Sequence, residues 1–135
     1  MKKVIVTIER GEDGGYSLYA PDLQNVIIGM GDTVEQAKVD FSEGYREMVE
    51  TYQEDGVPVP EELQDVEFEY RYDAASMLAE AGKYINLAAL ARETGINATL
   101  IRQYKKGQYI SAKQAQRLQE GLQSMSRKIA ACTLV

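Results

Sequence analysis

The chain has 135 residues, of which 15 are Lys or Arg and 21 are Asp or Glu, and it contains no histidine. The absence of histidine excludes His-based acid–base catalysis, a Ser-His-Asp triad and His-ligated metal sites, and we expect no catalytic residue, no metal site and no cofactor. No apolar run approaches the ~20 residues that span a bilayer, and we recognise no secretory leader, so we expect a cytoplasmic protein without membrane contact.

The two halves of the chain carry opposite charges. Residues 1–72 hold 6 Lys and Arg against 17 Asp and Glu, whereas residues 73–135 hold 9 against 4. We therefore expect an acidic domain over residues 1–72 and a basic domain over residues 73–135, of which the basic one meets nucleic acid. The single Cys132 excludes an intrachain disulfide.

The acidic half is predicted to contain a small sheet. Apolar residues alternate with polar ones near residues 4–8 and again over residues 16–20, and a glycine-rich turn separates the two runs. A third short strand is expected at Val26–Ile28, ended by Gly29 and Gly31, which makes an antiparallel meander. Residues 66–72 also alternate, and their charges predict an edge strand.

One long helix is expected between the third and fourth strands. Thr33 and Gln36 have the spacing of a capping box, and Gly56 marks the far end of the helical pattern. An apolar stripe that we expect to lie on the sheet is formed by Val34, Ala37, Phe41, Tyr45, Met48 and Tyr52. Another face of the helix carries an acidic row made of Glu43, Glu47, Glu50 and Glu54. A solvated face is the simpler interpretation of this row, and a docking face for a basic partner is the functional one.

Three motifs in this half occur together in one known family. They are VIVTIERGEDGGYSLYAPDL at 4–23, GDTVEQA at 31–37 and GVPVPEEL at 56–63. In this combination residues 3–70 resemble the HicB antitoxin family. The resemblance implies a reduced RNase H-like fold that binds a small HicA-like toxin, an mRNA interferase, and a C-terminal domain that represses the operon. Because an RNA-cleaving toxin must be basic to hold phosphates, Glu43, Glu47 and Glu50 are our candidate toxin-binding residues.

The basic half is predicted to be all helical. Residues 74–81 form a short helix that ends at Gly82, and Asn86 and Asn97 can each cap a further helix. Gly95 lies between those two helices, where a tight turn requires positive φ. A seam between the helices is expected from Leu90, Ile96 and Ile101, with the small Ala91 where the two helices cross. Two helices joined in this way predict a helix-turn-helix, and the spacing is similar to that of phage-repressor (XRE) regulators.

A last helix is expected after Ser111 and Gln114, which form a second possible capping box. Its apolar stripe consists of Ala115, Leu118, Leu122, Met125 and Ile129. Core packing is the simpler interpretation of this stripe, and a homodimer seam is the alternative.

The second helix of the motif, near residues 98–106, would be the one that reads the major groove. The candidates for contacts with bases are Asn97, Thr99, Arg102, Gln103 and Lys106. The candidates for contacts with phosphates are Lys105, Tyr109, Ser111 and Lys113. The alternative is that the positive charges only solvate a domain that binds no DNA.

The fold class is thus α+β: a small antiparallel sheet with one helix, followed by an all-α helix-turn-helix domain. We expect an antitoxin that neutralises a HicA-like toxin and, as a homodimer or higher homo-oligomer, represses its own operon by binding double-stranded operator DNA. A stand-alone regulator whose acidic domain oligomerises or senses a ligand is the alternative. Metal-assisted nucleic-acid cleavage by carboxylates such as Asp13, Asp22, Asp32 and Asp40 is disfavoured, because the acidic surface would repel the substrate.

Overall fold

The computed structural model describes all of residues 1–135 and contains four strands, five α-helices and one short 3₁₀ helix. The chain forms two compact units, Met1–Asp73 and Ala74–Val135. Each unit has its own core of buried apolar side chains. None of the helices is long and apolar enough to cross a membrane.

The first unit holds a mixed four-stranded sheet. Its strands are β1 (Lys2–Arg10), β2 (Tyr16–Tyr19), β3 (Ile28–Gly31) and β4 (Val66–Tyr72), in the order β3-β2-β1-β4. The expected meander β1-β2-β3 is antiparallel, and β4 is an edge strand as expected. The expectation of an antiparallel sheet is wrong for β4, which pairs parallel with β1. The reason is the helix that follows β3, because it carries the chain back along the sheet and lets β4 start in the same direction as β1.

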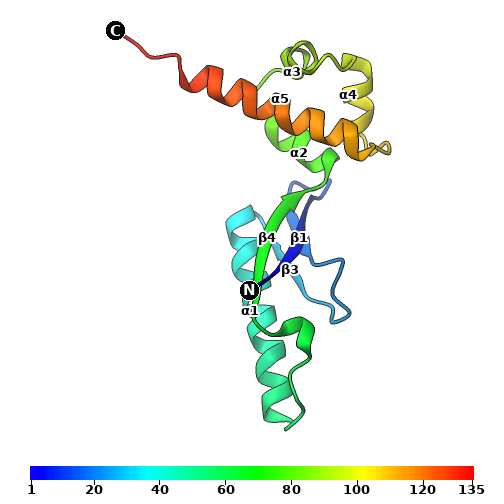
Figure 1. The fold of residues 1–135 in the computed structure, drawn as a ribbon, viewed down its shortest axis with the longest axis vertical. Coiled ribbons are helices and arrows are strands. Elements are labelled where there is room, and N and C mark those ends of the chain that lie inside the picture. The colour runs from blue at the N-terminus through cyan, green and yellow to red at the C-terminus, as the bar shows by residue number, and fades with distance from the viewer. The chain divides into compact units, whose positions relative to one another are not determined.

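The helix α1 (Val34–Glu54) lies along one face of the sheet (Figure 1). It begins as expected at Thr33, whose hydroxyl accepts a hydrogen bond of 3.1 Å from the Gln36 amide. The predicted apolar stripe faces the sheet, where Phe41 is fully buried and meets Phe68 edge to face at 5.0 Å between ring centroids. The stripe is therefore confirmed as the face that builds the core.

The third strand differs from its prediction. It starts at Ile28 rather than Val26, and it includes Gly29 and Gly31, which were expected to end it. A Cβ atom at Gly29 would lie 2.6 Å from both the Cβ and the backbone nitrogen of Phe41. The glycines therefore sit in this strand because the α1 backbone passes too close for any side chain, not because the chain turns there.

A loop before β3 is fastened to the segment before β4 by one carboxylate. Glu62, in the 3₁₀ helix η1 (Glu61–Leu63), accepts hydrogen bonds from the amides of Gln24 at 3.0 Å and Asn25 at 2.9 Å. The Asn25 side chain donates to the same carboxylate and accepts a bond of 2.7 Å from the Tyr52 hydroxyl on α1. These bonds to the charged form hold the pKa of Glu62 below its usual range.

The second unit contains α2 (Ala74–Ala81), α3 (Leu87–Thr94), α4 (Ala98–Lys105) and α5 (Ala112–Ala130). The predicted caps are confirmed, because Asn86 and Asn97 accept from the second amide of α3 and α4, each at 2.8 Å. Gly95 has φ 74°, the left-handed conformation expected of the turn. The predicted seam is buried: Leu90 and Ile101 are fully enclosed, and Ile96 and Ala91 are nearly so.

The apolar stripe of α5 only partly enters this core. Leu118 is fully buried, and Leu122 and Met125 pack against the core while keeping some exposure. Ile129, one turn beyond Met125, is 58% exposed. The core-packing interpretation therefore holds for most of the stripe, and its last residue is left uncovered.

Candidate functional site

The solvent-facing side of α4 carries the side chains expected to read DNA bases. Ile101 and Tyr104 are buried and fix which side of the helix faces inward. The opposite side presents Thr99, Arg102 and Gln103, all exposed. Lys106, which caps the C-terminal end of α4, is also exposed. Asn97, which caps the N-terminal end, is exposed too, although its side-chain oxygen already accepts a hydrogen bond from the Thr99 amide. The α4 surface is thus polar, basic and unobstructed within its own unit.

A groove of about 550 Å³ runs beside this surface, between α4 and the start of α3. Its lining residues are Asn86, Leu87, Ala88, Ala98, Arg102, Lys105 and Lys106. Three of these side chains are cationic, and the groove also meets the amide end of α3, where the helix dipole is positive. The cations suit an anionic group, for example a backbone phosphate, and most of the remaining lining is apolar, from Leu87, Ala88 and Ala98.

The Arg102 side chain is part of both the exposed face of α4 and the groove beside it. Its guanidinium donates a hydrogen bond of 3.1 Å to the Thr99 hydroxyl one turn earlier, and it also lines the groove. This bond directs the exposed Arg102 side chain along the surface of α4 toward Thr99. Lys105, expected to contact phosphate, lines the same groove, whereas Gln103 does not.

The other candidate phosphate residues lie after α4. Tyr109, in the loop before α5, is 83% exposed, and Lys113 is exposed in the first turn of α5. Ser111 is different, because it is half-buried and its hydroxyl accepts the Gln114 amide at 3.2 Å as the cap of α5. The structure gives Ser111 a role in starting a helix, which the sequence also predicted.

The contribution of α3 to the groove was not predicted from the sequence. Asn86 was expected only as a helix cap, and nothing in the pattern placed Leu87 and Ala88 beside α4. The Asn86 cap was the available signal, because it marks the amide end of α3, where the helix dipole is positive.

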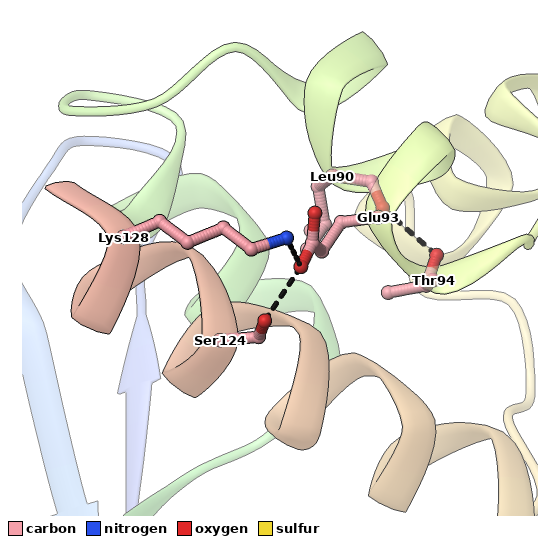
Figure 2. Close-up of polar contacts among 5 residues, drawn as sticks. All are labelled: Leu90, Glu93, Thr94, Ser124 and Lys128. Carbon is pink, nitrogen blue, oxygen red and sulfur yellow. Dashed lines mark hydrogen bonds and ion pairs between the residues drawn. The ribbon is translucent and has the colours of Figure 1, made fainter.

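A polar cluster joins α3 to α5. Figure 2 shows Glu93 pointing from α3 toward α5, where its carboxylate accepts from Ser124 at 2.6 Å and pairs with Lys128 at 2.8 Å. The Lys128 ammonium and the Ser124 hydroxyl hold the pKa of Glu93 below its usual range. Arg117 makes a second connection by donating a bond of 2.7 Å to the backbone carbonyl of Thr94. Two independent polar contacts thus fix the last turn of α3 against α5.

The candidate toxin-binding residues lie on the exposed side of α1. Glu43, Glu47 and Glu50 are all exposed. The nearby cations are already engaged: Arg46 pairs with Glu50 at 3.5 Å, and the Lys38 ammonium lies 4.8 Å from the centre of the Tyr70 ring. The field of this face is negative because α1 carries six Asp and Glu side chains against two Lys and Arg.

An apolar side chain lies within the same helix face. Val39 is 59% exposed and is followed one turn later by Glu43. It lines a shallow depression of about 370 Å³ together with Glu35, Lys38, Ser42, Glu43 and Arg46. This side of α1 thus combines carboxylates with an uncovered aliphatic group.

The four aspartates considered for metal-assisted cleavage do not gather into a site. Asp13 accepts the Gly15 amide at 2.9 Å within a turn, and Asp40 accepts the Met30 amide at 2.8 Å at the outer edge of β3. No group of three or more Cys, Asp or Glu side chains is arranged to hold a metal ion. The two carboxylates serve the backbone instead.

No protein-family model, curated protein or solved structure matches this chain.

Proposed function

We propose that the second unit is a helix-turn-helix domain that binds double-stranded operator DNA. The single observation that carries this proposal is the basic groove beside the exposed face of α4. A helix in the major groove needs polar side chains on its outer face and cations beside it to meet the DNA backbone, and α4 has both. Thr99, Arg102 and Gln103 face the bases in this arrangement, and Lys105 faces phosphates. Lys106, expected to contact bases, lines the groove with Lys105 and is assigned to phosphates instead.

We further propose that the first unit is the toxin-binding half of a HicB-like antitoxin. The resemblance of residues 3–70 to that family supports this, as does the acidic face of α1, on which Arg46 and Lys38 are engaged within the unit. A basic RNA-cleaving toxin would be attracted to Glu43, Glu47 and Glu50 and would cover Val39 on binding. A reduced RNase H-like arrangement of the mixed sheet with α1 forms part of the same proposal.

The proposed repressor acts as a homodimer or higher homo-oligomer, because operators usually contain paired half-sites. The uncovered Ile129 at the end of the α5 stripe supports a seam between copies at that place. An Ile129→Asp variant that keeps the size of the wild-type assembly in light scattering would refute this seam.

One co-purification experiment tests the toxin-binding function. The full chain, with a tag, is expressed together with the protein encoded beside it. A small basic protein that co-purifies, and that stops growth when it is expressed alone, supports the antitoxin function. The triple charge reversal of Glu43, Glu47 and Glu50 to Lys should then abolish the association, whereas reversal of Glu9 and Glu12, remote in sequence, should preserve it.

A retardation assay tests the DNA-binding function separately. The purified chain is mixed with a duplex covering the promoter of its own gene and with a scrambled duplex of equal length. Preferential retardation of the promoter without any co-purifying partner would favour a stand-alone regulator. Equal retardation of both duplexes would contradict operator recognition.

A further inference from the structure

The orientation of α4 depends on the short turn that joins it to α3. Thr94 ends α3, and Gly95 and Ile96 lead into the cap of α4. The Thr94 hydroxyl accepts the Ile96 amide at 3.2 Å and donates to the Leu90 carbonyl at 2.8 Å, the second of these bonds being drawn in Figure 2. These two hydrogen bonds thus link the turn to the last part of α3.

The helix α5 reaches the same turn through Arg117. One guanidinium nitrogen donates to the Thr94 carbonyl at 2.7 Å, and the other donates to the Gln114 side chain at 2.9 Å. The last carbonyls of a helix have no partner within the helix, and a cation there also meets the negative end of the helix dipole. The half-buried Arg117 therefore satisfies the end of α3 at the residue before the turn.

Close packing holds Arg117 at this place. Gly121, one turn further along α5, lies so near α3 that a Cβ atom there would be 2.3 Å from the Thr94 methyl carbon. The pairing of Glu93 with Ser124 and Lys128 holds the following turn of α5 (Figure 2). The Thr94 carbonyl is thus fixed by α5 and not only by its own helix.

We propose that Arg117 is a positioning residue for DNA recognition: by holding the Thr94 carbonyl, it fixes the turn and so the orientation in which α4 presents Thr99, Arg102 and Gln103. This inference rests on the proposed DNA-binding function of the second unit. Arg117 acts through the turn and not by touching DNA, because its guanidinium is engaged within the unit.

The test compares Arg117→Ala with Arg127→Ala in the full chain. Arg127 is an exposed cation on the same helix and matches the loss of charge. Affinity for the promoter duplex is measured at several salt concentrations. Arg117→Ala should weaken binding by roughly tenfold to one hundredfold, the value of a misplaced base contact, without changing the salt slope. A slope reduced by about 0.9 would instead make Arg117 a direct phosphate contact and would overturn the proposal.

Hydrogen exchange provides a reading that does not depend on DNA. The amide of Ile96 should exchange at least about tenfold faster in Arg117→Ala than in the wild type, and Arg127→Ala should leave it unchanged. Equal exchange in all three proteins would refute the inference. If the wild type fails to bind the promoter duplex, the DNA-binding function fails, and the exchange rates still decide whether Arg117 fixes the turn.

A second pair of variants guards against a misfolded Arg117→Ala. Thr94→Val keeps the side-chain shape and removes the hydroxyl that holds Ile96, whereas Thr94→Ser keeps the hydroxyl. We expect Thr94→Val to weaken promoter binding at an unchanged salt slope and Thr94→Ser to bind like the wild type. Equal binding by both variants would contradict the role of the turn.

Discussion

Replacing Gly29 by Ala should destabilise the first unit, although Gly29 lies in a strand, where Ala normally does no harm. A Cβ atom at this position would lie 2.6 Å from two atoms of Phe41 and 2.5 Å from the carbonyl oxygen of Ala37. Ordinary carbon contacts are about 3.5–4.0 Å, so α1 would have to move from β3 by roughly 1 Å. Overpacking of this kind costs about 1–3 kcal/mol, and the smaller entropy of unfolded Ala returns about 0.4–1 kcal/mol. We expect a net loss of about 1–2 kcal/mol.

The assay is urea unfolding of the full chain followed by the amide signals of buried residues. Leu18 reports on the first unit, and Leu118 in the second unit serves as an internal standard. Gly44→Ala is the matched control, because a Cβ atom there would be no closer than 3.5 Å to any neighbour, and Ala in a helix should add up to about 1 kcal/mol. If Gly29→Ala changes the Leu18 transition by less than about 0.5 kcal/mol, the close approach of α1 does not explain the glycine.

Three further predictions concern charge and capping. Changing Lys105 or Lys106 to Gln should reduce the magnitude of the slope of log affinity against log salt by about 0.9 for each lysine. Fluorescence anisotropy over a salt series measures this slope, and an unchanged slope would contradict the phosphate contact. Because the folded pKa of Glu62 is depressed, its contribution to stability is present above pH 4.5 and is lost as the pH falls through the folded pKa. The stability of Glu62→Gln, measured by urea unfolding at several pH values, should therefore lack the part of the acid dependence that the wild type shows in this range. Identical pH profiles of the two proteins would rule out this carboxylate as the source of that dependence. Ser111→Ala should cost the second unit about 1 kcal/mol in thermal unfolding and Ser111→Asp much less, so equal losses would argue against the cap.

Local features of this chain followed from its sequence because neighbouring residues decide them. A capping side chain acts on an amide two or three positions away, which is why Thr33, Asn86 and Asn97 could be assigned as helix starts. The stripe of α1 was equally predictable, since helical spacing alone puts its members on one face. The outward side chains of α4 followed in the same way once Ile101 was assigned to the seam, whereas the burial of Tyr104 was seen only in the structure.

Contacts between distant segments were decided only by the tertiary structure. The sequence pattern of β4 predicts a strand but not its direction, which depends on how α1 returns the chain along the sheet. Gly29 resembles a strand end in the sequence, and only the nearness of the α1 backbone explains its place within β3. The groove beside α4 and the bond from Arg117 to Thr94 likewise join residues far apart in the chain. Hydrophobic periodicity indicates which side of an element is buried, but it does not indicate which other element that side packs against.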